Sequence, residues 1–242
     1  MPVLGLGFDG DYGVYHSAYD DFYWMNHFGD PGYKYHTLMS QLWGVTALRL
    51  ANADLLPFDF AMYAANIRQF VNDLVKANEQ NLRRQPHPNS DVILSGGEAG
   101  AKDHTKSCPT CGTSGTASSP LDLREVQKAI DQFAAAGKKL NESLTRKLST
   151  GQIDPQLALT LNHGMMQVER NWLNPDGIPG RPWFKHILYG ARFTYAHLEL
   201  PGLTEAVEKQ DWPVAKQQAE ILERAIQENT KLLEDLMQAL TR

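Results

Sequence analysis

The sequence predicts a mainly α protein in which an antiparallel helical bundle follows a shorter N-terminal segment. Two observations predict this fold. Four long segments after Pro57 carry apolar residues at steps of three and four, which is the spacing of one helix face. Capping residues, prolines and glycines mark where these segments begin and end. Because each helix has an apolar stripe to bury, packing the stripes against each other in a bundle is the economical arrangement.

The N-terminal segment opens with an apolar run and a tight turn. Residues 3–8 predict a short buried strand, and the glycines within residues 10–13 allow a tight turn after it. Tyr15 and His16 are then expected on a loop between a strand and a helix, where ligands often bind. From the residues alone, an ordinary histidine at a turn is the better interpretation of His16. A half-buried aromatic residue is an equally good interpretation of Tyr15.

Helices are predicted on both sides of Pro57. Apolar residues recur with helical spacing from Pro31 onward, and Pro57 ends this first helix. Asp59 can cap a second helix, which fades out near residue 84. We therefore divide the chain at Pro57 into two predicted domains, residues 1–57 and 58–242.

Residues 85–119 differ in composition from the rest of the chain and predict an irregular loop inserted into the bundle. They are rich in proline, glycine, serine and threonine, and they contain both cysteines of the chain. His104, Cys108 and Cys111 have a spacing that supplies three ligands for a zinc ion, but structural zinc almost always takes four. An inert loop or a local disulfide is therefore the favoured interpretation, and zinc is the alternative.

Three further helices are predicted after this insertion. Each begins at a capping residue that is followed closely by proline, at residues 119–120, 154–155 and 211–213. Gly151 ends the first of them, and a turn at residues 174–177 ends the second. Gly137 is a position where a partner helix can approach closely, because glycine has no side chain.

Composition excludes several classes of function. The net charge of −5 is spread along 242 residues, so neither a nucleic-acid footprint nor a membrane-surface patch is indicated. No apolar stretch approaches the roughly 20 residues that a membrane helix needs. The chain as given is therefore expected to be soluble, to have no membrane segment and to bind no nucleic acid.

Several stretches of the sequence resemble the glutamate carboxypeptidase II and transferrin receptor family. They are YHSAYD at 15–20, FGDP at 28–31, YH at 35–36, LRLANADLLPF at 48–58, the passage at 171–189, and LPGL at 200–203. In that family a zinc peptidase domain is followed by a helical dimerisation domain. The resemblance implies that residues 1–57 are the C-terminal remnant of an α/β zinc peptidase domain. It also implies that residues 58–242 are a transferrin receptor-like dimerisation domain, which forms a homodimer.

The resemblance also implies roles for individual residues. His16 matches a ligand of one of the two zinc ions, and Tyr15 matches a donor to the carbonyl oxygen of the peptide substrate. Tyr195 matches a residue that contacts the C-terminal residue of the substrate. Thr194 replaces a lysine, so a neutral or broader preference is expected in place of an acidic one. The other zinc ligands and the general base lie upstream of this motif in the family, so this chain alone is not expected to hold the two zinc ions.

These observations lead to a main hypothesis and two alternatives. The main one is the C-terminal part of a zinc exopeptidase, a metallopeptidase of the carboxypeptidase type. The second is a non-catalytic module for dimerisation or partner binding, as in transferrin receptor. The third is a small zinc-loop protein centred on Cys108 and Cys111. Family members are anchored or exported through upstream segments, so the resemblance implies a location outside the cytoplasm. It does not specify whether the protein is secreted, periplasmic or part of an ectodomain.

Overall fold

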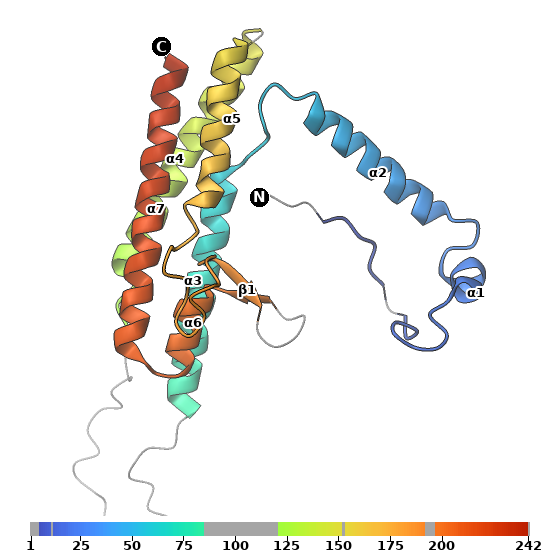
Figure 1. Cartoon of the computed structure of the whole chain (residues 1–242), viewed down its shortest axis with the longest axis horizontal. Coiled ribbons are helices and arrows are strands. Elements are labelled where there is room, and N and C mark those ends of the chain that lie inside the picture. The colour runs from blue at the N-terminus through green and yellow to red at the C-terminus, as the bar shows by residue number, and fades with distance from the viewer. Residues whose placement is uncertain (1–4, 11, 85–120, 152, 192–196, 242) are drawn as a thin grey trace, which may run out of the picture. The chain divides into compact units, whose positions relative to one another are not determined.

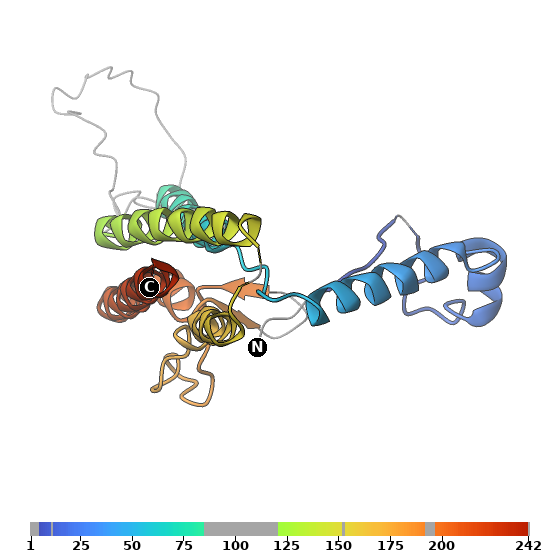
Figure 2. The ribbon, with the colours of Figure 1, turned by 90° about the horizontal axis from the view of Figure 1, so that it is seen from above.

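The computed structural model describes residues 5–10, 12–84, 121–151, 153–191 and 197–241 (Figures 1 and 2). The described chain is mainly helical, which confirms the predicted fold class. Its elements are α1 (Phe22–Trp24), the π-helix η1 (Met25–Gly29), α2 (Lys34–Ala51), α3 (Phe60–Arg84), α4 (Arg124–Ser149), α5 (Pro155–Arg170), β1 (Tyr189–Ala191), β2 (His197–Glu199), α6 (Pro201–Glu208) and α7 (Trp212–Thr241).

The N-terminal segment differs from the prediction where a strand was expected. Residues 5–8 form no strand, and no other described backbone pairs with them, so the predicted buried strand is wrong for this part. Helix α2 forms as predicted but buries none of its residues. Its apolar side chains occupy several faces of the helix, and Leu48 is 64% exposed. An apolar face is buried only where another element covers it, and the described residues leave most of this helix exposed.

The described residues form two compact units, and the long helices contribute to both. The first unit comprises residues 1–61, 135–171 and 228–242, and the second comprises residues 62–134 and 172–227. The domain boundary proposed at Pro57 stays a prediction.

Helix α5 packs against α7 in the first unit, where Gly164 lies close to the side chain of Leu236. A short connection joins it to α4, and Asp154 caps its start by accepting a hydrogen bond from the Leu157 amide at 2.8 Å, with Pro155 at the first helical position. Buried side chains of this unit fill the space between the helices: Phe60, Leu140, Leu161, Met165, Val168, Leu233 and Leu236. The capping and the core match the predicted start and apolar stripe of this helix.

Gly137 of α4 lies at a close helix crossing within the first unit. A Cβ atom on Gly137 would lie 2.7 Å from the amide nitrogen of Ala61, and the glycine is buried. The close approach that the sequence predicted therefore occurs with α3 of the same chain. Because α3 already covers Gly137, a helix of a second subunit cannot cross α4 at this glycine.

The core of the second unit surrounds Trp172, which is fully buried. Its indole stacks on Tyr63 at 5.9 Å between ring centroids and meets Phe133 edge-on at 6.1 Å. Strands β1 and β2 form an antiparallel hairpin beside this core, in which Tyr189 pairs with Glu199. Neither this hairpin nor helix α6 was predicted from the sequence.

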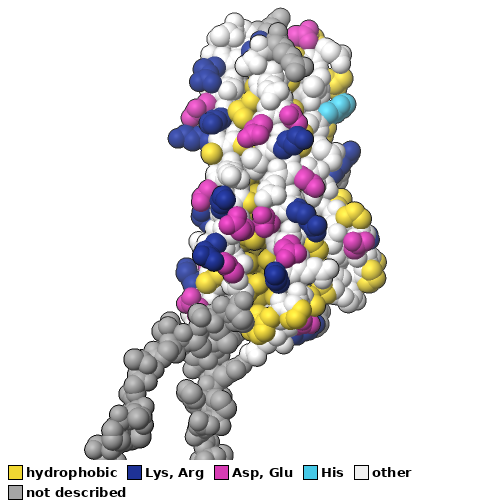
Figure 3. Space-filling model, turned by 90° about the vertical axis from the view of Figure 1, so that its left-hand side faces the viewer, with side chains coloured by type: hydrophobic (Ala, Val, Ile, Leu, Met, Phe, Trp, Pro, Cys, Tyr) yellow, Lys and Arg dark blue, Asp and Glu magenta, His cyan; other side chains and the backbone are white. Residues whose placement is uncertain are grey.

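The surface of the helical region is mixed in charge. Figure 3 shows the face that carries α4 and α7, where acidic and basic side chains are interspersed with small apolar areas. Helix α7 keeps its predicted start near Trp212 and turns its apolar positions inward, as the buried Leu222, Ile226 and Leu233 show. Charged side chains of both signs therefore cover most of this face, and apolar side chains gather toward its lower end in Figure 3.

Candidate functional site

Tyr15 and His16 lie on a compact turn before α1. The Ser17 amide donates to the Val14 carbonyl at 2.9 Å, and the Asp20 amide donates to the Ser17 carbonyl at 3.1 Å. The Asp20 carboxylate accepts a hydrogen bond from the His16 amide at 3.2 Å. His16 itself has a φ of 62°, in the left-handed region that non-glycine residues seldom adopt. The turn therefore holds the His16 backbone in an unusual conformation, as is common at functional sites.

The turn brings the two predicted site residues together and leaves both exposed. The ring centroids of Tyr15 and His16 are 4.0 Å apart, and Tyr15 is 66% exposed. Within the described part of the chain, the His16 imidazole makes no hydrogen bond, so its nitrogens are free to bind a ligand. Neither side chain packs into a core, so a buried aromatic role for Tyr15 does not apply here.

The described residues do not form a complete metal site. Among residues 5–84, 121–151, 153–191 and 197–241, apart from residue 11, no three His, Cys, Asp or Glu side chains are placed to hold a metal ion. His16 can offer one nitrogen, whereas zinc in proteins takes about four ligands, three of them from protein even in catalytic sites. A zinc site at His16 therefore needs ligands from outside this described set.

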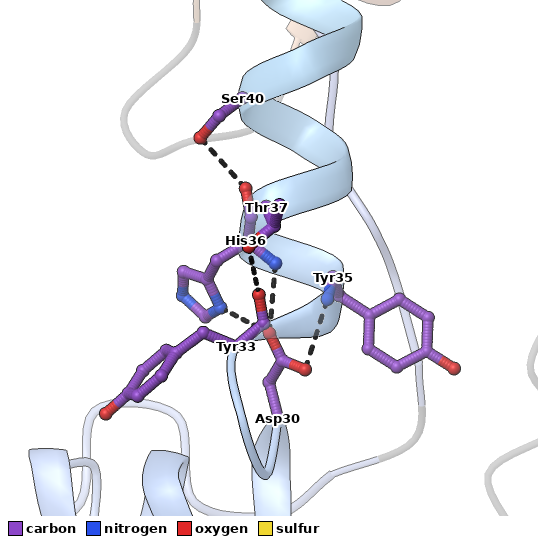
Figure 4. Close-up of polar contacts among 6 residues, drawn as sticks. All are labelled: Asp30, Tyr33, Tyr35, His36, Thr37 and Ser40. Carbon is purple, nitrogen blue, oxygen red and sulfur yellow. Dashed lines mark hydrogen bonds and ion pairs between the residues drawn. The ribbon is translucent and has the colours of Figure 1, made fainter.

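A second polar cluster, which was not predicted from the sequence, lies at the start of α2 (Figure 4). Asp30 is 4% exposed and accepts hydrogen bonds from the amides of Tyr35, at 3.1 Å, and His36, at 2.9 Å. Nδ1 of His36 lies 2.7 Å from the same carboxylate, so this nitrogen carries a proton. Burial alone would raise the pKa of Asp30, but these hydrogen bonds outweigh it and lower the pKa from 3.8 to about 2.

The Asp30 cluster organises the helix terminus. The carboxylate satisfies amide groups in the first turn of α2 that have no partner within the helix. The chain reaches this position through Gly32 and Tyr33, both with positive φ. The sequence does contain a signal for this turn, because Asp30 is followed by proline and glycine directly before an apolar helical pattern. Asp30 and His36 therefore fix the entry to α2.

An aromatic-lined hollow of about 590 Å³ lies beside this cluster. Tyr12 stacks on Trp24 at 5.8 Å, and Phe8 meets Tyr35 edge-on at 5.4 Å between ring centroids. Asp30 and His36 contribute to the same lining, whereas Tyr15 and His16 do not. The hollow and the Tyr15–His16 turn are therefore separate features of the N-terminal segment.

Other predicted site residues lie outside the described residues. They are Thr194 and Tyr195 and the loop residues His104, Cys108 and Cys111. The residues that flank Thr194 and Tyr195 are described: Ala191 and His197 are paired in the β1–β2 hairpin. This pairing fixes the two ends of the segment in which the predicted substrate-binding residues occur.

Comparison with known proteins identifies the class of the helical region. Residues 121–234 match the transferrin receptor-like dimerisation domain. This match includes α4, α5, the hairpin, α6 and most of α7. The chain therefore contains a transferrin receptor-like dimerisation domain.

Similarity to named proteins extends well beyond that domain. The chain is 28% identical over 242 residues to the probable glutamate carboxypeptidase LAMP1 of Arabidopsis thaliana, and 29% identical over 244 residues to the probable glutamate carboxypeptidase AMP1 of the same plant. Each alignment covers 96% of this chain and 29% of the relative. The aminopeptidase NAALADL1 of Rattus norvegicus is 25% identical over 195 residues, which cover 81% of this chain and 21% of that protein.

The chain is thus a distant homologue of the glutamate carboxypeptidases over most of its length. It spans less than a third of the length of these relatives. In the described part of the chain, every helix is too short or too polar to cross a membrane.

Proposed function

We propose that this chain supplies the C-terminal part of a zinc exopeptidase that resembles glutamate carboxypeptidase II. The observation that carries the proposal is the extent of the similarity, which covers 96% of the chain and includes the N-terminal segment as well as the helical domain. Two of the relatives are named probable carboxypeptidases and one is named an aminopeptidase. Because carboxypeptidases and aminopeptidases act on peptides, we propose a peptide as the substrate of the complete protein.

In this proposal His16 is a ligand of one zinc ion and Tyr15 donates a hydrogen bond to the substrate carbonyl oxygen. The exposure of both side chains and the free imidazole of His16 support these roles. Zinc, when bound, supplies a Lewis acid that also lowers the pKa of a bound water. The Tyr15 hydroxyl would stabilise negative charge on the carbonyl oxygen, an effect worth about 3 kcal/mol at a preorganised site.

The remaining ligands and the general base would come from another part of the protein. The exposed apolar side chains of α2 support this arrangement, because Leu42, Val45 and Leu48 recur at steps of three along the helix and are 44%, 49% and 64% exposed. Tyr195 would contact the C-terminal residue of the substrate, and Thr194 would remove the preference for an acidic side chain at that position.

We further propose that the helical domain forms a homodimer through the outward faces of α4 and α7. The match of residues 121–234 to a dimerisation domain supports this pairing. Because charged side chains of both signs cover this face (Figure 3), complementary polar contacts would contribute much of the interface. A two-fold dimer is the commonest symmetry for a homo-oligomer.

The peptidase proposal is tested by amino-acid release from short peptides. The protein would be expressed from its complete coding sequence and assayed with added zinc. We expect zinc-dependent hydrolysis that His16→Ala abolishes, whereas His27→Ala, which removes another exposed histidine of the same segment, leaves it intact.

Two other outcomes are informative. Hydrolysis that persists at the wild-type rate in His16→Ala would contradict the role of this histidine. A complete protein that forms dimers but neither binds zinc nor hydrolyses peptides would instead support the non-catalytic alternative. In that alternative the helical domain serves only for association, which is compatible with the match to a dimerisation domain.

A further inference from the structure

A cavity of about 660 Å³ in the second unit is lined by the turn at residues 178–184 and by helix α6. Its volume is within the range of about 300–1,000 Å³ that is usual for small-molecule sites. The charged and aromatic residues of its lining are Arg181, Trp183, Phe184, Glu205, Glu208 and Lys209. His16 is not among the lining residues, so the cavity is distinct from the candidate zinc site.

Two aromatic rings form one wall of this cavity. The rings of Trp183 and Phe184 meet at an angle of 81°, and their centroids are 6.1 Å apart. Trp183 is 72% exposed, so most of its indole is accessible to a ligand. Aromatic faces and edges attract other aromatic groups at such distances. This wall therefore suits a ligand that carries an aromatic ring.

Hydrogen bonds and an ion pair hold the wall in place. The Ile178 amide donates to the Phe184 carbonyl oxygen at 3.0 Å, and the Phe184 amide donates to the Arg181 carbonyl oxygen at 2.9 Å. The Arg181 guanidinium forms an ion pair with Glu205, which joins the turn to α6. Because the two sides of the cavity are connected in this way, binding requires little reordering of its walls.

The other wall carries charges of both signs. Glu205, Glu208 and Lys209 are three and four residues apart, so they share one face at the end of α6. Among the residues that the structure describes, Lys209 forms no ion pair, so its ammonium can bind a carboxylate. A carboxylate accepts several hydrogen bonds, so Glu208 can accept one from an ammonium in addition to its other interaction. This wall thus matches a ligand that carries one charge of each sign.

We propose that this cavity binds a free amino acid with an aromatic side chain. The carboxylate of the zwitterion binds Lys209, and its ammonium binds Glu208. Its ring packs into the corner formed by Trp183 and Phe184. A ligand that lacks either charge leaves one of the two charged side chains without this partner and binds more weakly. Binding here uses no group of the proposed zinc site, so it goes beyond the peptidase function and does not depend on it.

Isothermal titration calorimetry with the protein expressed from its complete coding sequence tests this proposal. The probe is L-phenylalanine, for which we expect saturable binding with a Kd of about 1 mM or lower. N-acetylphenylalanine lacks the ammonium, phenylalanine amide lacks the carboxylate, and L-alanine lacks the ring. Each should bind about fivefold more weakly, because one of the three contacts is lost. No saturable binding of phenylalanine, or equal binding of all four compounds, would overturn the proposal.

Three variants locate the site. Lys209→Gln and Glu208→Gln each remove one charge, and Trp183→Ala removes the exposed indole, so each should raise the Kd for phenylalanine about fivefold. Trp183→Phe keeps an aromatic ring and should retain most of the affinity. The matched control is Lys216→Gln, which removes an exposed lysine of α7 outside the cavity lining and should leave the Kd unchanged. These side chains are exposed, so the melting temperature should change little in all of these variants.

The same titrations separate this site from the proposed peptidase site. Phenylalanine can also bind to a peptidase as a reaction product. If His16→Ala weakened its binding and Trp183→Ala did not, the cavity proposal would be refuted and the peptidase proposal would stand. A protein that binds phenylalanine through Trp183 and Lys209 but hydrolyses no peptide would support the cavity proposal and refute the peptidase function.

Discussion

Nδ2 of Asn171 donates a hydrogen bond to Oδ1 of Asn229 at 2.8 Å, and this bond joins the end of α5 to α7 within the first unit. Asn229 is completely buried and donates in turn to the Val168 carbonyl oxygen at 3.3 Å. Nε2 of Gln167 donates a hydrogen bond to Oδ1 of Asn171 at 2.9 Å. Buried amides that are partnered in this way fix one alignment of two helices, because any shift along the helix axis would leave polar groups unsatisfied.

Asn229→Ala should therefore destabilise the folded protein. The change removes the bond to Asn171 and leaves the Val168 carbonyl without its side-chain donor, at a cost of about 2 kcal/mol in the free energy of unfolding. Urea denaturation measures this value. The control is Asn72→Ala, at an exposed position of α3, which should change the free energy of unfolding by less than about 0.5 kcal/mol. Equal stability of the two variants would show that the network contributes nothing.

Gly137→Ala should also destabilise the protein, although alanine favours helices more than glycine does. The added Cβ would lie 2.7 Å from a backbone nitrogen of α3, so the helices must move apart, which costs about 1–3 kcal/mol. Gly44→Ala is the matched control, because no atom lies within 4 Å of its added Cβ and the substitution should stabilise α2 by up to about 1 kcal/mol. Thermal unfolding of both variants measures the difference, and a stabilised Gly137→Ala would contradict the close crossing.

The Asp30 cluster should make the start of α2 sensitive to acid. Because the pKa of Asp30 is lowered from 3.8 to about 2 in the folded state, the folded chain binds fewer protons than the unfolded chain between these values. Stabilisation by the carboxylate is thus complete above pH 3.8 and is lost as the pH falls toward 2. Hydrogen exchange at the amides of Tyr35 and His36, corrected for the intrinsic rate at each pH, should show protection that decreases as the pH falls over this range.

Two variants serve as controls for this acid sensitivity. Asp30→Asn should remove the pH dependence of the protection factors at these amides, which are the exchange rates relative to those of the unfolded chain at the same pH. Asp176→Asn, at an exposed turn, should preserve it. If the protection of Tyr35 and His36 did not change with pH in the wild type, the carboxylate would not be the group that holds this helix end.

The long helices could be predicted because their apolar residues repeat over many turns. The starts of α3, α5 and α7 also carried local signals, such as Asp154 followed by Pro155. Strands β1 and β2 were missed because three residues are too few for a period of two to be recognised. Helix α6 was missed because its N-cap, Leu200, adopts a left-handed conformation that its residue type does not favour.

The candidate site could be predicted only in part. The resemblance identified Tyr15 and His16, and their proximity follows from being neighbours in sequence. Helix α2 was predicted from its apolar periodicity, but periodicity does not show what covers a face, and the structure buries none of the residues of this helix. The Asp30–His36 contact and the Arg181–Glu205 pair depend on backbone turns that bring residues together, and no single residue type signals such contacts.

Zinc binding by the protein expressed from its complete coding sequence tests the central claim most directly. Metal content after equilibrium dialysis should approach two zinc ions per chain in the wild type, as in a two-metal hydrolytic site. His16→Ala should weaken binding of one ion by at least about 100-fold, because one imidazole ligand is lost, whereas His27→Ala should bind zinc like the wild type. Equal zinc content and affinity in the wild type and His16→Ala would contradict the assignment of this chain to a zinc peptidase site.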